Sequence, residues 1–266
     1  MLNSKSMLKP KVVAIVQARM GSTRLPKKVL MKINDHSMLE EVIKRTKAIK
    51  GVDEVIVATT ENPKDLQIVA RCRKLKIRVF RGLEEDVLDR YYQCAKEAGA
   101  DVIIRITSDC PLLDPTIVEE GLKFFQTTNA DYVSNALKRT YPRGLDFEMF
   151  TFQALEKAWK EGQEQTDREH VTPYIYSHPA IFKIAHLTNS KDYSEYRLTV
   201  DTQIDLELVM TIFKVLGKKR QIFGLNQIVK FLERNPKLAK INSEVVQKDK
   251  HLQEEALKKL ETISIR

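Results

Sequence analysis

The chain has 266 residues, of which 42% are apolar and 30% are charged, and its formal net charge is +9. This composition is typical of a soluble globular protein with a substantial core, and it excludes a membrane-spanning helix, because no run approaches the ~18 apolar residues required. The three cysteines lack Cys-x-x-Cys spacing and indicate neither a disulfide framework nor a zinc site. Residues 1–11 lack the apolar core of a signal peptide, so we expect a cytoplasmic protein.

The positive charge is concentrated near the C-terminus, where the stretch from Lys214 to the end holds 13 Lys and Arg against 6 Asp and Glu. A basic tail can indicate contact with nucleic acid or with an anionic membrane surface. Here acidic residues are interspersed with the basic ones, and the only aromatic residues are Phe223 and Phe231. We therefore expect a solvated helical face, with no nucleic-acid partner and no membrane insertion.

Predicted strands and helices alternate in the first half of the chain. Short apolar, β-branched runs predict strands at residues 12–16, 54–58, 77–80, 101–106 and 131–134. Helical spacing of apolar residues predicts helices from residue 37, over about 63–75 and 86–99, and from about 116 to 127. This alternation predicts a Rossmann-like α/β fold, with a mainly parallel sheet flanked by helices.

The pattern becomes less regular after Asn135. Residues 143–148 resemble a loop that enters an edge strand, and residues 182–187 and 196–200 read as further strands. Helices are predicted over 152–159, 203–216 and 225–232, and beyond Lys237. A further helix is predicted to begin at a cap, Thr166 or Asp167, with Glu169 in a capping-box position. We expect an α/β domain over residues 1–217, which includes an irregular region at about 136–190, and a basic helical C-terminal extension over 218–266.

The turn after the first strand gathers four cations and a Gly-Ser pair: Arg19, Gly21, Ser22, Arg24, Lys27 and Lys28. Open α/β sheets bind ligands at the carboxyl ends of their strands, and backbone N–H groups there can hold an anion. The turn matches neither the P-loop nor the dinucleotide fingerprint. A solvated basic turn is the alternative reading, but a polyphosphate ligand would explain why like charges gather at this position.

Two aspartates follow predicted strands at comparable positions. Asp109 comes after the strand at 101–106, and Asp201 comes after the strand at 196–200, with Asp205 one helical turn later. Carboxylate oxygens that meet phosphate oxygens are the ligands that Mg²⁺ prefers. Helix capping is the alternative, because both aspartates precede helices.

Three motifs resemble those of the CMP-sugar cytidylyltransferase superfamily, which includes the CMP-Kdo and CMP-acylneuraminate synthetases. Ala18-Arg-Met-Gly-Ser-Thr-Arg-Leu-Pro-Lys-Lys28 is similar to its Ala-Arg-x-x-Ser-x-Arg-x-Pro-x-Lys signature. Thr107-Ser-Asp-Cys-Pro-Leu112 resembles its Gly-Asp-x-Pro-Leu loop, and Val200-Asp-Thr-Gln-Ile-Asp-Leu206 resembles its Val-Asp-Thr-x-x-Asp-Leu motif. Thr107 departs from the Gln of the Kdo enzymes.

Further stretches resemble the spore-coat polysaccharide biosynthesis branch of the same superfamily: Gly82-x-x-x-Asp-Val-Leu-Asp-Arg90, Pro142-Arg-Gly-Leu-Asp-Phe-Glu148 and Arg168-Glu-His-Val-Thr172. The resemblance covers the chain from about Val12 to the helix after Asp201. It implies transfer of CMP from CTP to an acidic sugar or related acidic metabolite, with release of pyrophosphate, for polysaccharide or glycoconjugate biosynthesis. It also implies a homodimer, with residues 136–190 serving acceptor binding or dimerisation.

The resemblance assigns roles to residues of this chain. It implies that Asp109 and Asp201 hold Mg²⁺ and that Arg19, Lys28 and Asp109 are catalytic. Nucleotide contacts are expected from Ala18, Arg19, Gly21, Ser22, Arg24, Lys28, Ala58, Thr59, Thr60 and Ser108. Acceptor contacts are expected from Arg143, Asp146, Glu148, Arg168 and His170. Arg143 or Arg168 would bind a carboxylate in a bidentate manner, and His170 is either a general base or a structural hydrogen-bonding residue.

Two other functions are compatible with parts of the sequence. A nucleotide-sugar glycosyltransferase would share the sheet architecture, but such enzymes typically carry Asp-x-Asp at the metal, where this chain has Thr107-Ser108-Asp109. A non-enzymatic polyanion-binding module would use the basic C-terminal extension and would bind less tightly as salt is added.

Overall fold

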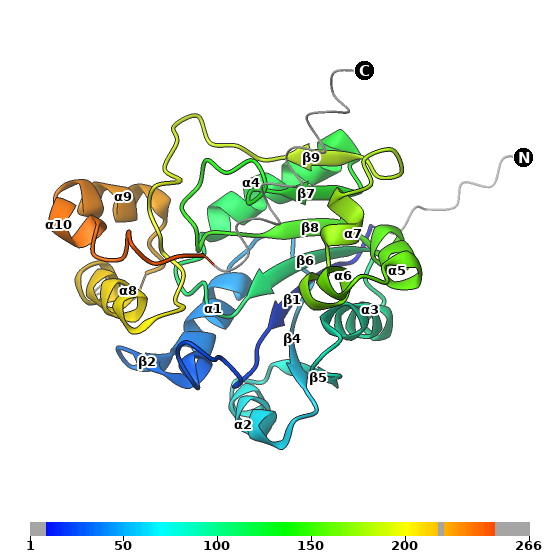
Figure 1. Cartoon of the computed structure of the whole chain (residues 1–266), viewed down its shortest axis with the longest axis horizontal. Coiled ribbons are helices and arrows are strands. Elements are labelled where there is room, and N and C mark those ends of the chain that lie inside the picture. The colour runs from blue at the N-terminus through cyan, green and yellow to red at the C-terminus, as the bar shows by residue number, and fades with distance from the viewer. Residues whose placement is uncertain (1–8, 218–220, 248–266) are drawn as a thin grey trace, which may run out of the picture.

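The computed structural model describes residues 9–217 and 221–247, and its centre is a seven-stranded sheet (Figure 1). The strands lie in the order β5 (Arg78–Gly82), β4 (Glu54–Thr60), β1 (Val12–Gln17), β6 (Val102–Thr107), β8 (Glu148–Thr151), β7 (Tyr132–Ser134) and β9 (Ile184–His186). All neighbouring strands pair in parallel except β8, which is antiparallel to both β6 and β7. The predicted α/β fold with a mainly parallel sheet is confirmed.

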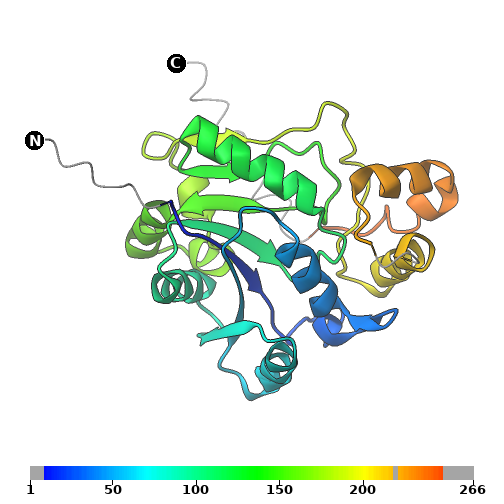
Figure 2. The same cartoon turned by 180° about the vertical axis from the view of Figure 1, so that it is seen from behind.

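Helices cover both faces of this sheet, as the two opposite views show (Figure 1, Figure 2). One core cluster includes residues of α1 (Met38–Lys47), α2 (Leu66–Lys74), α4 (Pro115–Thr128), α8 (Gln203–Leu216) and α9 (Leu225–Glu233). The other includes residues of α3 (Val87–Ala98), α5 (Phe152–Glu161) and α7 (Pro173–Tyr176). The short helices α6 (Gln165–His170) and α10 (Pro236–Ala239), the 3-10 turns η1 (Lys28–Leu30) and η2 (Pro63–Asp65), and a hairpin of β2 (Lys32–Ile33) and β3 (His36–Ser37) complete the fold.

Strand β1 shows why the first half of the chain could be predicted. Its side chains alternate between the two clusters, with Val12, Ala14 and Val16 in one and Val13 and Ile15 in the other. A strand that is buried on both faces reads as a continuous apolar run, which is the pattern that predicted it.

Local capping interactions determine where several helices begin and end. Ser37 and Glu40 form a capping box at the start of α1, and Asp86 accepts a hydrogen bond from the backbone N–H of Asp89 at the start of α3. Gly99 ends α3 with a φ of 61°, a left-handed conformation that glycine adopts without steric cost.

The less regular second half contains three corrections. Strand β8 begins at Glu148 and lies inside the sheet, not at its edge, and both Met149 and Phe150 are fully buried. Residues 196–200 form no strand, because only an isolated bridge joins Arg197 to Arg143. Helix α6 begins after Glu164, so the predicted cap at Thr166 or Asp167 and the capping box with Glu169 are wrong.

The C-terminal part differs from the predicted solvated helical face. Helix α9 buries Leu225, Ile228, Val229 and Leu232 in the same core cluster as β1, so one of its faces is not solvated. Beyond α10, residues 240–247 form turns and irregular backbone and no helix. The remainder of the predicted extension, residues 218–220 and 248–266, lies outside the described residues. Residues 1–8, part of the segment in which no signal peptide is expected, also lie outside them. No helix among the described residues has the length and apolar character needed to cross a bilayer.

Candidate active site

A cavity of about 420 Å³ lies where β1 and β6 end. Its walls come from the loop after β1, the loop between β5 and α3, the start of α3, the end of β6 and the loop after it, α6, and the segment leading into α8. Ten residues predicted to bind nucleotide, metal or acceptor line it: Ala18, Arg19, Gly21, Ser22, Arg24, Lys28, Ser108, Asp109, His170 and Asp201. The structure therefore brings the predicted cationic turn and both predicted metal ligands to one cavity.

The loop after β1 is held in shape by its own backbone. The N–H of Ser22 donates to the carbonyl of Met20 at 3.0 Å, and the Ser22 hydroxyl accepts from the N–H of Leu25 at 3.3 Å. The N–H of Met20 is bound by the Asp65 carboxylate at 2.8 Å, and Lys27 has a positive φ of 60°. These contacts fix the turn that presents Arg19, Arg24 and Lys28 to the cavity.

Lys28 joins the two predicted metal ligands. Its Nζ lies 3.0 Å from Asp109 Oδ2 and 2.9 Å from Asp201 Oδ1, and it also donates to the carbonyl of Val200 at 2.7 Å. Burial by itself would lower the pKa of Lys28, but the charges of the two carboxylates raise it above its ordinary value. Burial by itself would raise the pKa of Asp109, but Lys28 and nearby hydrogen bonds lower that pKa to about 2. Both partners of this ion pair are therefore charged at neutral pH.

Neither aspartate caps a helix, which was the alternative reading. Asp114 accepts the first hydrogen bond of α4, and Thr202 and Asp205 form the capping box of α8. The carboxylates of Asp109 and Asp201 instead face Lys28, with 28% and 13% of their side-chain surface exposed. The geometry therefore excludes helix capping as the reason for these two residues.

The two carboxylates fit a hard divalent cation. They already hold one positive charge, the Lys28 ammonium, between an oxygen of each. Within the described ranges no group of three or more His, Cys, Asp or Glu side chains is arranged to hold a metal ion. Mg²⁺ commonly takes one or two carboxylates from a protein and its remaining oxygens from water and substrate phosphates, so Asp109 and Asp201 would suffice.

Two arginines also contact Asp201. Arg24 Nη2 lies 2.9 Å from its Oδ2, and Arg197 Nη2 donates to the same oxygen at 2.8 Å. Arg197 was not among the predicted site residues, because it lies in what read as an ordinary strand. Its side chain is only 9% exposed, and the signal in the sequence was an arginine within a predicted strand, four positions before a predicted metal ligand.

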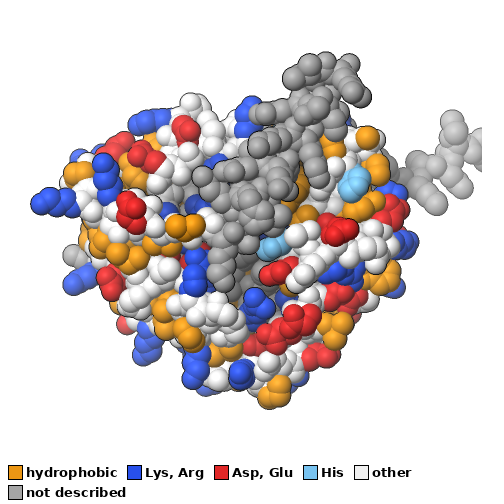
Figure 3. Space-filling view, in the orientation of Figure 1, with side chains coloured by type: hydrophobic (Ala, Val, Ile, Leu, Met, Phe, Trp, Pro, Cys, Tyr) orange, Lys and Arg blue, Asp and Glu red, His pale blue; other side chains and the backbone are white. Residues whose placement is uncertain are grey.

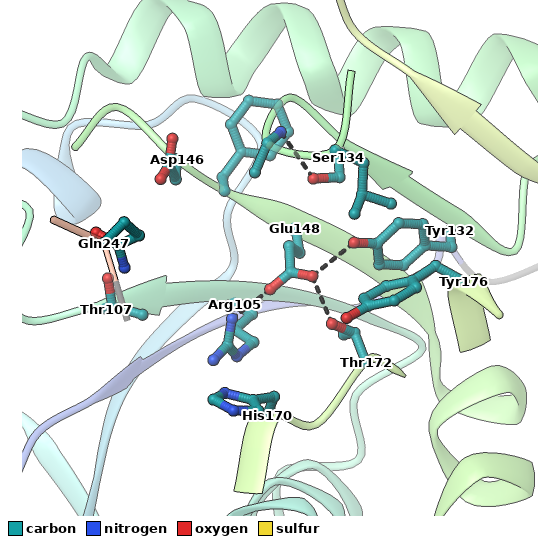
Figure 4. Close-up of a pocket in the computed structure, with 13 residues that line it drawn as sticks. Arg105, Thr107, Tyr132, Ser134, Asp146, Glu148, His170, Thr172, Tyr176 and Gln247 are labelled. Atoms are coloured by element: carbon teal, nitrogen blue, oxygen red, sulfur yellow. Dashed lines mark hydrogen bonds and ion pairs between the residues drawn. The ribbon is translucent and has the colours of Figure 1, made fainter. Parts of the chain in front are cut away.

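A second cavity, of about 150 Å³, adjoins the first and is drawn in Figure 4. The two share Arg105, Thr107 and His170 in their linings. At its centre, Glu148 accepts hydrogen bonds from the hydroxyls of Tyr132 and Thr172, both at 2.5 Å. Its remaining oxygen forms an ion pair with Arg105, which lies opposite it on β6.

Arg105 is the second residue that the sequence analysis missed. It interrupts the apolar strand β6, and its Nε is buried with no hydrogen-bond partner among residues 9–217 and 221–247. Burial by itself would lower its pKa, but the charge of Glu148 and smaller contributions raise the pKa instead. A charge in an otherwise apolar strand was the signal that could have identified it.

The predicted acceptor residues lie in different places. Glu148, Asp146 and His170 line the second cavity, where Asp146 is held by Arg139 Nη1 at 2.5 Å. Arg168 lines neither cavity and forms an ion pair with Asp86. Arg143 is also absent from both linings, and its backbone accepts the N–H of Leu198 at 2.6 Å. The structure thus groups three of the five predicted acceptor residues.

His170 ends α6 and lines both cavities; Figure 4 shows its imidazole below Arg105 in the smaller one. Within the part of the chain that the structure describes, no hydrogen bond to its imidazole is present. The structural hydrogen bond that was the alternative for this residue is therefore not observed among those residues.

Three predicted nucleotide contacts are buried in β4. Ala58, Thr59 and Thr60 have no exposed surface and line neither cavity. The Thr60 hydroxyl is instead bound to the carboxylate of Asp65. Side chains without exposed surface cannot contact a ligand in this conformation, so the proposed nucleotide site excludes all three.

Comparison with known proteins places the chain among enzymes of one kind. The family model described as cytidylyltransferase matches residues 13–258. The uncharacterized protein MJ1063 of Methanocaldococcus jannaschii is 43% identical over 90% of this chain and 97% of its own length. The spore coat polysaccharide biosynthesis protein SpsF of Bacillus subtilis is 33% identical, with 86% of this chain and 96% of SpsF covered.

Solved structures agree with this relationship. A cytidylyltransferase from Leptospira borgpetersenii superposes with a TM-score of 0.83 and 34% identity, over 87% of this chain and 97% of that one. The synthetase for CMP and 2-keto-3-deoxy-manno-octonic acid, solved in complex with CTP, superposes with a TM-score of 0.57 at 19% identity, over 77% and 98% of the two chains. The latter likeness shows a shared fold. The chain belongs to the cytidylyltransferase family.

Proposed function

We propose that the protein transfers CMP from CTP to an acidic sugar or a related acidic metabolite and releases pyrophosphate. One observation carries this proposal: a cationic loop and two carboxylates, distant in sequence, face a single cavity and are joined there by Lys28. The similarity to SpsF supports a product used in polysaccharide or glycoconjugate biosynthesis. The proposed location is the cytoplasm, where CTP is available.

The larger cavity is the proposed nucleotide site. Its volume of about 420 Å³ is within the range of small-molecule sites. Arg19, Arg24 and Lys28 would neutralise the triphosphate, and the backbone N–H groups around Gly21 and Ser22 would bind its oxygens. Ser108 and Ala18 line the same cavity and would contact the remainder of the nucleotide.

The reaction is an in-line displacement at phosphorus. An acceptor oxygen forms a bond to the α-phosphorus of CTP, the bond from that phosphorus to the bridging oxygen breaks, and pyrophosphate leaves while the acceptor loses its proton. Little covalent chemistry falls to the protein in such transfers, so Arg19 and Lys28 would act by placing and neutralising the β- and γ-phosphates. When bound by Asp109 and Asp201, Mg²⁺ would supply Lewis-acid stabilisation of the phosphate oxygens.

The smaller cavity is the proposed acceptor site, because it adjoins the nucleotide cavity and is lined by hydroxyl groups suited to a sugar. Arg105 and His170 lie where the two cavities meet, so they are placed to contact an acceptor carboxylate or hydroxyl. Arg143 and Arg168, expected to bind that carboxylate, line neither cavity, so Arg105 replaces them in this proposal.

The quaternary structure is a further part of the proposal. We propose a homodimer, supported by the position of β9 at the end of the sheet among the described residues and by Ile181 near it, which is 49% exposed. Edge strands offer unpaired backbone groups for association. Light scattering coupled to size-exclusion chromatography measures the mass directly, and a mass of one chain at micromolar concentration would contradict the dimer.

Pyrophosphate release tests the proposed reaction. CTP, UTP, ATP and GTP are each combined with a panel of acidic and neutral sugars in the presence of Mg²⁺, and we expect release only with CTP and an acidic acceptor. Asp109→Asn should abolish that release and leave the circular dichroism spectrum unchanged. Release with a neutral sugar alone would contradict the acidic acceptor, and near-normal turnover by Asp109→Asn would contradict the metal assignment.

A further inference from the structure

The last described residues return to the candidate active site. We call residues 238–247 the C-terminal strap; Figure 1 shows it running from α10 back toward the middle of the molecule. Asn242 in the middle of this strap is 2% exposed. Its Nδ2 donates to Asp205 Oδ1 at 2.8 Å and to the carbonyl of Arg197 at 3.0 Å. The buried Asn242 side chain, with two hydrogen bonds to residues 197–205, therefore anchors the strap.

Arg197 connects this anchor to the candidate metal ligand. Its Nε donates to Asp205 Oδ1 at 3.0 Å, and its Nη2 donates to Asp201 Oδ2 at 2.8 Å. Asp205 has no exposed surface, and its other oxygen accepts the N–H groups that cap α8. The guanidinium is therefore held on one side by a rigid carboxylate, and it holds Asp201 on the other.

The end of the strap holds Arg197 from a third direction and reaches both cavities. Gln247 Oε1 accepts a hydrogen bond from Arg197 Nη1 at 2.9 Å, and Gln247 lines the smaller cavity. The carbonyl of Val246 accepts a hydrogen bond from Nη1 of Arg24, which lines the larger cavity. The strap is thus bonded to two arginines that both contact Asp201.

We infer that Asn242 and Gln247 are positioning residues, which set the orientation of Asp201 through Arg197 and so complete the site for metal-bound nucleotide. The inference rests on the proposed function. Lys28 contacts Oδ1 of Asp201, while Arg197 and Arg24 contact Oδ2, so the arginines fix the rotation of the carboxylate that directs its other oxygen toward Lys28. Side chains that orient a metal ligand from behind affect metal affinity although they do not touch the metal.

The test compares Asn242→Ala with Asn235→Ala in the full chain. Asn235 is an exposed asparagine whose Nδ2 donates to the carbonyl of Phe231 in α9, so its loss removes a similar bond that does not involve Arg197. Binding of Mn²⁺ in the presence of CTP is followed by electron paramagnetic resonance, and CTP binding without metal is followed by calorimetry. We expect Asn242→Ala to weaken Mn²⁺ binding about 10- to 100-fold, with metal-free CTP binding and Asn235→Ala unchanged.

A second variant keeps the inference testable if Asn242→Ala does not fold. Gln247→Ala removes one acceptor from Arg197 at a half-buried position, and we expect it to weaken Mn²⁺ binding about threefold. Wild-type Mn²⁺ affinity in either folded variant would overturn the inference and leave the proposed function intact. A wild-type protein that binds no Mn²⁺ with CTP would overturn both.

Discussion

The larger cavity is lined by charges that lie in a loop and at strand ends, whereas the smaller cavity is lined by side chains that are bonded mainly to one another. In the first, Lys28 bridges Asp109 and Asp201, and side chains of the cationic loop line the cavity. In the second, Glu148 is saturated by Arg105, Tyr132 and Thr172. Among the described residues, the larger cavity therefore contains opposite charges in equal number, five basic and five acidic side chains, whereas the smaller cavity presents a fixed arrangement of hydrogen-bonding groups.

In the larger, charged cavity, replacement of Lys28 should have the largest effect on activity. Lys28→Ala removes the cation that lies between two carboxylates and that we propose neutralises phosphate charge, so we expect kcat to fall about 10²- to 10³-fold. Steady-state pyrophosphate release measures this. The matched control is Lys27→Ala. Lys27 is an exposed cation one position earlier, and it does not line the cavity. Equal losses in the two variants would show that only the general charge of the loop matters.

Substitutions in the smaller cavity, whose side chains are bonded to one another, should mainly lower the free energy of unfolding. Glu148→Ala leaves Arg105 buried without its counter-charge, so we expect the free energy of unfolding to fall by about 3–5 kcal/mol. Urea denaturation measures this value. Glu97→Ala removes one of the two carboxylate partners of Arg78, at a position that is 61% exposed, where a loss of about 0–1 kcal/mol is expected. Similar losses in both would contradict the contrast between a buried network and surface charge.

Replacing His170 tests whether a residue that lines both cavities acts in catalysis or in stability. His170→Ala removes an imidazole that has no hydrogen-bond partner among the described residues, so the free energy of unfolding should change by less than about 0.5 kcal/mol. The kcat/KM for the acceptor should fall about tenfold or more, because the ring lies between the proposed acceptor and nucleotide sites. A large loss of stability with unchanged kcat/KM would assign His170 a structural role.

The smallest expected effect is the loss of stability that the Lys28–Asp109 pair causes at low pH. The pKa of Asp109 is lowered from 3.8 to about 2 in the fold, so the pair contributes stability above the unfolded pKa and loses that contribution as pH falls from about 4 toward 2. Over that window, the free energy of unfolding should fall more steeply in the wild type than in Asp109→Asn. Parallel curves would show that the pair does not lower this pKa.

The charged cavity could be predicted from the sequence much better than the bonded one. The loop at Arg19 and Lys28 is contiguous, and Asp109 and Asp201 follow strand-like runs, so local pattern and motif resemblance identified them. Glu148 was assigned to an edge strand, because nothing in its own neighbourhood shows that β8 pairs with both β6 and β7. Arg105 and Tyr132 were missed for the same reason, since their partner comes from another strand.

The sequence by itself determined the alternation of strands and helices, the cationic turn and the acidic residues that face it, because these depend on local periodicity and on short motifs. Only the tertiary structure decided that Thr59 and Thr60 are buried, that β8 is interior, and that the C-terminal strap returns to Arg197. These features depend on which distant segments pack together. The contact between Lys28 and Asp201 joins residues 173 positions apart, a proximity that the folded chain alone creates.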